Sequence, residues 1–200
     1  MRIDPLPISG AWLCTPVVHD DSRGRFLEWL RIDLLAAATG RTFTVLQANH
    51  SLSARGVVRG IHLSDVSPGQ AKLVYCSGGA VLDVVVDVRV GSPTFGVVES
   101  VMLDAAEPRA VFVAEGLGHG FCALTEEASV TYLVSSVYDP AAERIVSPFD
   151  PELAVPWPAG LDITVSPKDA EAPSLTAAAA AGLLPTYEDC VARYRDLAAG

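Results

Sequence analysis

The stretch Ala80-Val81-Leu82-Asp83-Val84-Val85-Val86-Asp87-Val88-Arg89 has the alternation that is typical of a β-strand. Successive side chains of a strand point to opposite faces of the sheet. One face of this strand is therefore wholly apolar and is expected in a core; it carries Leu82, Val84, Val86 and Val88. The opposite face is semi-polar and could line a cavity; it carries Asp83, Val85, Asp87 and Arg89.

Similar short runs of β-branched residues, separated by Gly, Pro, Asp and Ser, extend on both sides of this strand from about Thr42 to Val137. Many short strands between turn residues indicate an all-β sandwich, jelly roll or small barrel. The predicted strands are Val45–Asn49, Val57–Leu63, Lys72–Cys76, Ala80–Val88, Val97–Leu103, Arg109–Val113 and Val130–Val137.

Helical patterns are confined to the two ends of this β-rich region. We predict a short helix at Arg31–Thr39 that ends at Gly40, and C-terminal helices at Ser174–Ala181 and Thr186–Ala199, the last with Thr186 as its N-cap. The chain has no internal repeat and no linker long enough to divide it. We therefore expect one domain over residues 1–200, with the β core at about 42–137 and the C-terminal helices at about 174–199.

The composition restricts the partners. The formal charge is −10, from 14 Lys+Arg and 24 Asp+Glu. Such a surface repels nucleic acid phosphates, so no nucleic acid partner is expected. An anionic ligand would need a local group of the few available cations, which gives each Arg and Lys within a motif more weight.

The cysteines and the N-terminus indicate the compartment. Four widely spaced cysteines without a CxxC pair favour buried, reduced thiols, as in a cytosolic protein. The N-terminus Met1-Arg2-Ile3-Asp4-Pro5 is too polar for a signal peptide, and the apolar runs are too short to span a membrane. We expect a cytoplasmic protein with no membrane partner.

The motif Arg59-Gly60-Ile61-His62, with Lys72 ten residues after the histidine, indicates proton-transfer chemistry. Histidine is suited to accept a proton near neutral pH, although a lone histidine in an apolar run is more often a core residue. Either Asp83 or Asp169 could orient it. Lys72 starts an apolar strand, where it could extend to solvent or stabilise an enolate.

Further polar residues could complete a site. Gln47, Asn49 and Ser51 share one strand face, which could face water or line a barrel mouth. Tyr132 and Tyr138 share a parity that could direct both inward, either as packing residues or, for one of them, as a proton donor opposite His62.

The segment from Arg23 to Glu28 joins cations, an aromatic ring and a carboxylate. Guanidinium groups for phosphate, a ring for base stacking and an acceptor for a base N–H are what a nucleotide diphosphate requires. A solvated turn would have the same composition. The segment is suggestive of a nucleotide site; its candidate residues are Arg23, Phe26 and Glu28.

The sequence lacks the motifs that are typical of several other enzyme classes. The four histidines do not have the spacing of a metal-binding cupin, so no metal is expected; they are His19, His50, His62 and His119. The chain contains no GxSxG, no P-loop and no GxGxxG motif, which disfavours serine hydrolysis, P-loop phosphoryl transfer and Rossmann redox chemistry.

Taken together, the chain resembles the dTDP-4-dehydrorhamnose 3,5-epimerase family, which includes deoxysugar epimerases of antibiotic pathways. The matching blocks occur in order and cover roughly residues 12 to 175. They are Asp21–Gly24, Gln47–Ser51, Gly56–His62, Gly69–Lys72, Asp83–Arg89, Gly91–Gly96, Gly118–Phe121, Tyr132, Tyr138, Asp150-Pro151 and Ser166–Asp169.

The resemblance implies a cupin-like jelly-roll homodimer that epimerises a dTDP-4-keto-6-deoxyhexose at C3, C5 or both, without metal or organic cofactor. It implies that His62 is the general base, oriented by Asp169, that Tyr132 is the general acid, and that Lys72 stabilises the enolate. Arg23, Phe26 and Glu28 would reach the nucleotide, from their own or a partner subunit. The remaining substrate-binding residues would be Gln47, Asn49, Arg59, His119, Tyr138, Glu143 and Lys168.

The sequence departs from this family at Leu63-Ser64, where an aromatic residue and glutamine are common, and at Gly118, where alanine is usual. We expect both changes to touch the pocket. Two other functions remain open: a nucleotide-sugar-binding module without turnover, and a metal-dependent cupin. The presence of both a base and an acid favours the epimerase.

Overall fold

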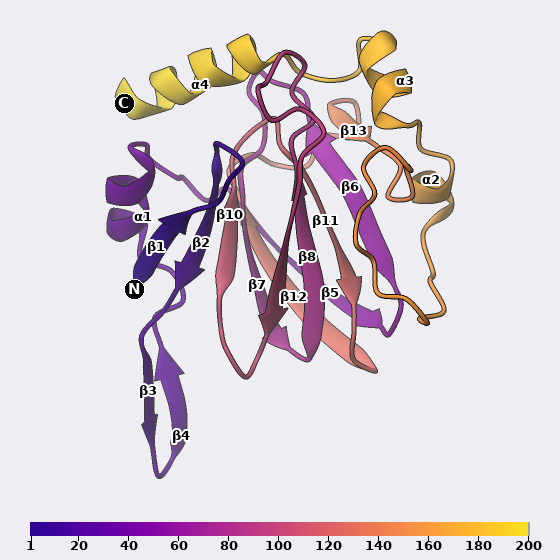
Figure 1. Cartoon of the computed structure of the whole chain (residues 1–200). Helices are drawn as coiled ribbons and strands as arrows, with labels where there is room; N and C mark the ends of the chain where they lie inside the picture. The colour runs from indigo at the N-terminus through magenta and orange to yellow at the C-terminus, as the bar shows by residue number, and fades with distance from the viewer. Residues whose placement is uncertain (200) are drawn as a thin grey trace.

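The computed structural model describes residues 1–199 as a sandwich of two antiparallel sheets (Figure 1). The strand order of the first sheet is β1 (Arg2–Pro5), β2 (Ala11–Thr15), β10 (Ala110–Val113), β7 (Lys72–Gly78), β12 (Glu127–Val134) and β5 (Gln47–Ala54). The order of the second sheet is β13 (Glu143–Ile145), β6 (Val58–Ser64), β11 (Gly118–Ala123), β8 (Ala80–Val86) and β9 (Val98–Asp104). Strands that are distant in the chain lie side by side, and the predicted jelly roll is confirmed.

Each predicted strand is present, with boundaries shifted by a few residues; the largest shift is in β5, which continues to Ala54. The sequence patterns did not identify β1, β2, β11 or β13, nor the strands at 18–21 and 24–27. Strand β11 was missed because Gly118 and Gly120 lower its strand propensity. Strands β1, β2 and β13 lie outside residues 42–137, so both sheets recruit segments beyond that range.

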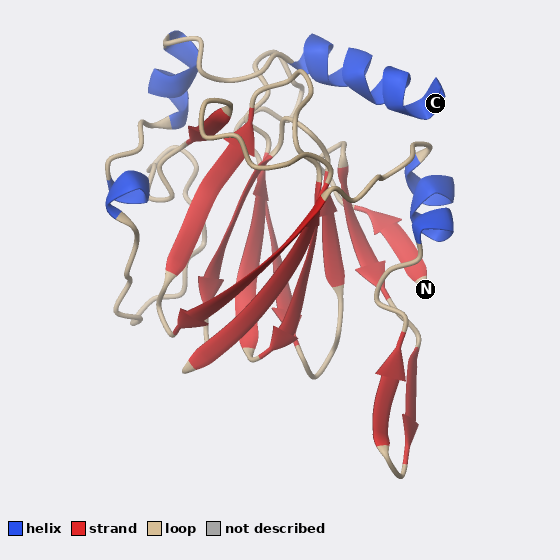
Figure 2. Ribbon diagram, turned by 180° about the vertical axis from the view of Figure 1, so that it is seen from behind, coloured by secondary structure: helices blue, strands red, loops and turns tan. Residues whose placement is uncertain are grey.

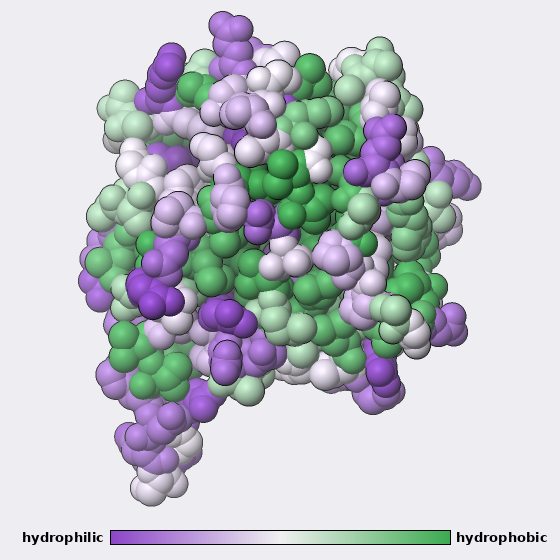
Figure 3. Space-filling view, viewed as in Figure 1, coloured by the Kyte–Doolittle hydropathy of each residue, from purple (hydrophilic) through white to green (hydrophobic). Residues whose placement is uncertain are grey.

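Strands β3 (Val18–Asp21) and β4 (Gly24–Leu27) form a separate two-stranded hairpin that extends away from the sandwich (Figure 1). The space-filling view shows mostly hydrophilic side chains at the tip of this projection (Figure 3). The side chains at the tip of the hairpin therefore lie away from the β sandwich, where another molecule can contact them.

The helices lie around the periphery of the sandwich (Figure 2). Helix α1 (Ile32–Thr39) ends at Gly40 in the left-handed conformation, as predicted. Helices α3 (Leu175–Ala180) and α4 (Tyr187–Ala199) confirm the predicted C-terminal helices, and the Thr186 hydroxyl accepts a hydrogen bond from the Asp189 backbone N–H at 3.1 Å. The four-residue helix α2 (Pro167–Ala170) was not predicted. None of the helices in residues 1–199 is long and apolar enough to span a membrane.

Apolar side chains fill the space between the sheets and also cover the outer face of the first sheet. On that outer face, Phe43 packs edge-on against Phe112 with ring centroids 5.2 Å apart, and Trp29 stacks on Tyr75 at 4.9 Å. The segment between the hairpin and β5 thus closes the outer face. All four cysteines are buried and free, as predicted.

The semi-polar face of Ala80–Arg89 does not line a cavity, contrary to our expectation. Asp87 and Arg89 are fully buried and form an ion pair with a 2.7 Å separation. Burial alone would raise the pKa of Asp87, but hydrogen bonds from Arg89, Ser92 and Thr94 lower it. The charges on this face are neutralised inside the protein instead of being presented to a ligand.

Helix α4 packs over the loops that lead into β7 and β11. The Arg193 Nε atom donates to the Pro68 carbonyl at 3.2 Å, and the Tyr194 hydroxyl donates to the Glu115 carbonyl. Both loops precede strands that carry cavity residues. The C-terminal helix therefore stabilises the frame of the site from outside.

Strands β6 and β11 come unusually close at a pair of glycines. Gly60 has a φ of +124°, and a Cβ atom placed on it would lie 2.6 Å from the Gly120 Cα and 2.7 Å from the His119 carbonyl oxygen. Only glycine allows this backbone approach. The contact lies next to His62 and His119, which are directly paired across the two strands.

We predict that Gly60→Ala destabilises the protein more than Gly24→Ala. Gly24 has a nearly identical φ of +127° but nothing within 4 Å of its added Cβ. Both variants carry the backbone cost of about 1–2 kcal/mol, whereas only the first adds a clash of about 1–3 kcal/mol. Urea unfolding measures the difference. Equal losses of stability in the two variants would contradict the proposed role of the strand contact.

Candidate active site

A cavity of about 700 Å³ lies between the two sheets, near α2. It is lined by every predicted site residue except Arg23, Phe26 and Glu28. The first sheet contributes Gln47, Asn49, Lys72 and Tyr132; the second contributes Arg59, His62, His119 and Glu143; Tyr138 and the α2 residues Lys168 and Asp169 complete the set. The fold thus brings together side chains that are distributed over more than a hundred residues.

His62 is held by a buried carboxylate. Its Nε2 atom lies 2.7 Å from Oδ1 of Asp169, and this resolves the choice between Asp83 and Asp169 in favour of Asp169. Burial raises the pKa of Asp169, but the hydrogen bond and charge of His62 lower it overall, so the group is a carboxylate. The bond directs Nδ1 of His62 away from Asp169, as the ring nitrogen free for chemistry.

The carboxylate reaches His62 because a short helix presents it. The Ser166 hydroxyl accepts a hydrogen bond from the Asp169 backbone N–H at 3.1 Å, and Pro167 follows the cap. Proline at the first helical position and serine at the N-cap are favourable at a helix start. This Ser-Pro signal was present in the sequence and could have predicted α2.

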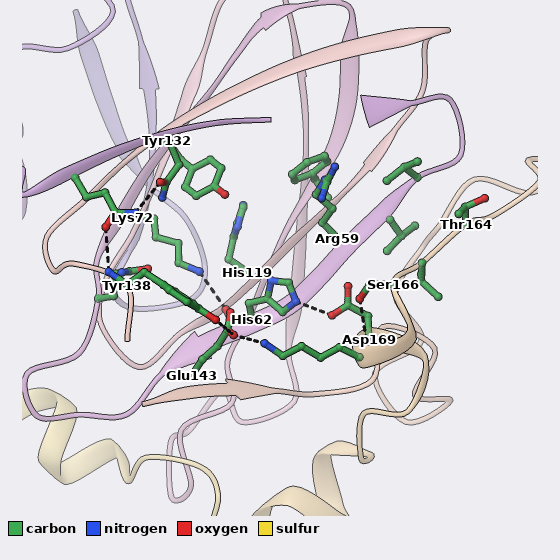
Figure 4. Close-up of a pocket in the computed structure, with 18 residues that line it drawn as sticks. Arg59, His62, Lys72, His119, Tyr132, Tyr138, Glu143, Thr164, Ser166 and Asp169 are labelled. Atoms are coloured by element: carbon green, nitrogen blue, oxygen red, sulfur yellow. Dashed lines mark hydrogen bonds and ion pairs between the residues drawn. The ribbon is translucent and has the colours of Figure 1, made fainter. Parts of the chain in front are cut away.

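Tyr132 faces His62 from the opposite sheet. It lies directly across from Asn49 on β5, and Figure 4 shows Tyr132 and His62 approaching the cavity from opposite sides. Burial raises the pKa of the Tyr132 phenol, an effect that Glu143 reinforces and Arg59 opposes. The side chain is therefore a protonated phenol at neutral pH, able to donate a proton.

The two lysines of the whole sequence, Lys72 and Lys168, both line this cavity. Lys72 Nζ contacts the His62 carbonyl at 3.4 Å. Burial lowers the pKa of Lys72 to about 8, and Glu143 and Asp83 partly offset this effect. In contrast, the hydrogen bond from Lys168 to Glu143 raises the pKa of Lys168. An acidic protein thus places its lysines at one site.

Glu143 connects several of the polar side chains. It is ion-paired with Lys168 and accepts a hydrogen bond from the Tyr138 hydroxyl at 3.2 Å. The Tyr138 backbone N–H donates to Gln47 Oε1 at 3.0 Å, and Gln47 donates to Asn49 at 2.7 Å. This chain of contacts crosses from the second sheet to the first (Figure 4). Burial raises the pKa of Glu143, but the bond from Lys168 and the charge of His62 lower it overall.

Arg59 and His119 are oriented by residues outside the cavity lining. Arg59 Nε donates to the Ser53 hydroxyl of the first sheet at 3.1 Å. His119 Nε2 lies 2.7 Å from Oδ2 of the fully buried Asp83. Asp83, one of the two carboxylates considered for His62, is therefore the partner of the neighbouring histidine.

Arg23, Phe26 and Glu28 are on or next to the β3–β4 hairpin and do not reach the cavity of their own chain. Figures 1 and 2 both place the hairpin and α2 on opposite sides of the body. Arg23 is ion-paired with Asp21 on the hairpin, and Phe26 is 66% exposed. These three side chains are available to another molecule.

Sequence reasoning missed seven further lining residues. Most of them lay within recognised blocks but were given no role; these are Val57, Val58, Gln70, Phe121 and Ser166. The others are Thr164 and Val165. Thr164 reaches the cavity through a parallel bridge with Val57, and no local pattern indicates a contact between segments so distant in the chain.

The departures at Leu63-Ser64 and Gly118 do not touch the pocket, contrary to our expectation. Leu63 is buried in the apolar cluster behind β6, and neither Ser64 nor Gly118 is among the lining residues. A Cβ atom on Gly118 would lie 2.6 Å from Ile61 Cγ2. Leu63 and Gly118 therefore affect the packing behind the site, on the outer side of β6 and β11.

The arrangement is suited to moving protons at carbon. A histidine with its own carboxylate, a phenol in the opposite sheet and an ammonium group can abstract a proton next to a carbonyl, stabilise the enolate and return a proton. Residues 1–199 contain no group of three or more His, Cys, Asp or Glu side chains placed to hold a metal ion. Fold and site together define a jelly-roll isomerase.

The comparisons with known proteins agree. Residues 5–177 match the family model of dTDP-4-dehydrorhamnose 3,5-epimerase, and the chain belongs to this family. It is 50% identical to the dTDP-4-dehydrorhamnose 3,5-epimerase of Mycolicibacterium smegmatis, with 96% of this chain and 94% of that protein covered.

Two solved structures extend this similarity. One is NovW, a 4-keto-6-deoxy sugar epimerase from the novobiocin cluster of Streptomyces spheroides; it is 55% identical, with a TM-score of 0.93 and 95% of each chain covered. The other is ChmJ, a 3'-monoepimerase from Streptomyces bikiniensis in complex with dTDP-quinovose; it is 46% identical, with a TM-score of 0.96 and coverage of 98% of this chain and 100% of that one.

We predict that the two lysines titrate well apart. Because burial disfavours its charged form, Lys72 loses its proton as the pH rises through about 8, whereas Lys168 stays charged beyond the usual lysine range. Labelling lysine with ¹³C at Cε gives two NMR resonances, and Lys168→Arg assigns them. Two lysines that both titrate above pH 10 would contradict this description of the cavity.

Proposed function

We propose that this protein epimerises a dTDP-4-keto-6-deoxyhexose at C3, C5 or both, without a cofactor. The observation that carries the proposal is the position of the His62–Asp169 pair opposite the Tyr132 phenol, with Lys72 in the same cavity. The family membership and the substrates named for the relatives point to the same reaction.

The chemistry follows from the 4-keto group. The C3 and C5 hydrogens both flank the C4 carbonyl and are acidic for that reason. Nδ1 of His62 takes one of these protons, the C–H electron pair moves toward C4, and the negative charge collects on the C4 oxygen beside Lys72. Tyr132 then donates its proton to the same carbon on the other face, which inverts that centre. Solvent restores the protonation states of His62 and Tyr132.

Asp169 and Lys72 support this cycle electrostatically. The Asp169 carboxylate accepts the hydrogen on Nε2 of His62 and favours the imidazolium that forms when Nδ1 takes a proton. The ammonium of Lys72 is poorly solvated, so its attraction to an enolate oxygen is strong. Neither group needs to move during the reaction.

The remaining lining residues would bind the substrate. Arg59 and Lys168 supply positive charge for the diphosphate, and Gln47, Asn49 and Tyr138 supply hydrogen bonds. His119 would contact the sugar region. In this acidic protein, these cations give an anionic nucleotide sugar a local site to which it can bind.

A homodimer would give the hairpin residues a role. We propose that the hairpin of one copy carries Arg23, Phe26 and Glu28 to the nucleotide in the cavity of the other, since they do not reach their own cavity. Exposed apolar side chains around the edge strand β5, including Leu46 at 60% and Leu52 at 54%, would be covered in such a pair. The proposed setting is a cytoplasmic deoxysugar pathway, with no nucleic acid partner.

A nucleotide-sugar-binding module of the same fold is the alternative. A binder needs the cations and amides but has no use for a base and an acid on opposite sides of the ring. The oriented His62 and the protonated Tyr132 therefore favour turnover.

We predict that dTDP-4-keto-6-deoxyglucose exchanges its C3 proton, its C5 proton or both when incubated with the protein in deuterated water. Loss of the corresponding ¹H NMR signals identifies which carbons react. His62→Ala should slow exchange by at least about 10²-fold, the usual contribution of a general base, while nucleotide binding is retained. His50→Ala, a surface histidine on β5, is the matched control.

Binding without exchange in the wild-type protein would contradict the epimerase proposal for this substrate. Exchange at an unchanged rate in His62→Ala would assign the base to another residue.

A further inference from the structure

A second histidine–carboxylate pair lies next to the first. His119 Nε2 is 2.7 Å from Oδ2 of Asp83, and Asp83 is fully buried. His119 is paired directly with His62 across β6 and β11, so both rings enter the cavity from the same sheet. Figure 4 shows His119 reaching into the cavity between Lys72 and Arg59.

Asp83 itself does not line the cavity. It stands on β8, the strand beyond β11, and its hydrogen bond to the cavity lining is the one with His119. Its other carboxylate oxygen, Oδ1, is buried and has no hydrogen-bond partner within residues 1–199. Burying a carboxylate with an unsatisfied oxygen costs stability. A residue present for stability alone would be better satisfied, as is Asp87, which directly follows this strand.

The bond to Asp83 determines which nitrogen of His119 faces the substrate. A carboxylate only accepts hydrogen bonds, so Nε2 carries the hydrogen that points to Asp83. Nδ1 is then the nitrogen left for the cavity, and no hydrogen bond to it is formed within the described chain. In the neutral ring Nδ1 is an acceptor, the group that a sugar hydroxyl requires.

Several other acceptor groups of the cavity lining already accept hydrogen bonds from neighbouring side chains. Glu143 accepts from Tyr138 and Lys168, and Asp169 accepts from His62. The Asn49 side-chain oxygen accepts from Gln47. His119 thus offers an acceptor that is free and oriented.

We infer that Asp83 is a positioning residue, which fixes the ring and tautomer of His119 so that Nδ1 accepts a hydrogen bond from a hydroxyl of the bound sugar. This inference rests on the proposed epimerase function. It assigns a role to Asp83, which does not line the cavity. It also gives the two adjacent histidines different roles: His62 transfers the proton, and His119 binds a sugar hydroxyl and so orients the sugar.

The test is a double-mutant cycle of Asp83→Asn and His119→Asn, with kcat and KM measured by the NMR epimerisation assay. We expect Asp83→Asn to lower kcat/KM roughly 10- to 100-fold, as loss of a carboxylate partner does for other oriented histidines. In the His119→Asn background, the same change should have almost no further effect. The Tm of Asp83→Asn should stay within about 4 °C of the wild type, because the amide removes a buried, half-satisfied charge.

Ser92→Ala is the matched control. It removes a buried hydrogen bond to a carboxylate, that of Asp87, which does not contact the cavity. Its effect on kcat/KM should be small and should be the same in the presence and absence of His119.

Two results would overturn the inference: wild-type kcat/KM in Asp83→Asn, or an equal loss in both His119 backgrounds, which would mark Asp83 as a structural residue. A wild-type protein without any C3 or C5 exchange would instead overturn the proposed function. The two failures are distinguishable because the wild-type assay comes first.

Discussion

The close approach of β6 and β11 at Gly60 and Gly120 is the constraint on which the site depends. With no side chains between them, the two backbones come so near that a Cβ on Gly60 would lie 2.6 Å from the Gly120 Cα. His62 and His119 are paired with each other directly next to this contact. Each ring is then fixed by a carboxylate from a different element, Asp169 on α2 and Asp83 on β8. One wall of the cavity thereby becomes a rigid frame for two imidazoles.

The opposite wall supplies the complementary chemistry. Lys72 and Tyr132 enter from the first sheet, so an ammonium group and a phenol face His62 across the cavity. In a protein of charge −10, the two lysines are both at this cavity and differ in their environment. Lys168 is paired with Glu143. Burial lowers the pKa of Lys72, and in this poorly solvated position its ammonium group would be strongly attracted to a negative charge on a bound ligand. Helix α4 packs against the loops that lead into β7 and β11.

Much of the fold could be predicted from strand periodicity, because alternating side chains such as those of Ala80–Val86 indicate a strand, whichever of its faces is buried. The glycine-rich β11 could not, since it lacks strand propensity. The four-residue α2 is too short for a periodic signal, and only Ser166 and Pro167 mark its start. Local sequence patterns were limited in the same way for the residues of the site. Local sequence identified His62 and Lys72 as unusual, but 107 positions separate His62 from Asp169, and only the resemblance favoured that carboxylate over Asp83.

The errors have a common physical origin. Asp87 and Arg89 were assigned to a cavity face because strand parity cannot tell a ligand from an internal ion pair. Leu63 and Gly118 were assigned to the pocket because they adjoin His62 and His119 in the chain, but neighbouring residues of a strand point to opposite faces of the sheet. In both cases the sequence indicated a face, and tertiary packing decided what that face contacts.

The central claim is that base and acid act on opposite faces of the same sugar ring. The most direct measurement is a crystal structure of the His62→Asn variant with bound dTDP-4-keto-6-deoxyglucose. The account predicts that the ring lies between residue 62 and the Tyr132 hydroxyl, with the C4 oxygen directed at Lys72 and C3 or C5 facing residue 62. A sugar bound with residue 62 and Tyr132 on the same face, or with C4 directed away from Lys72, would contradict it.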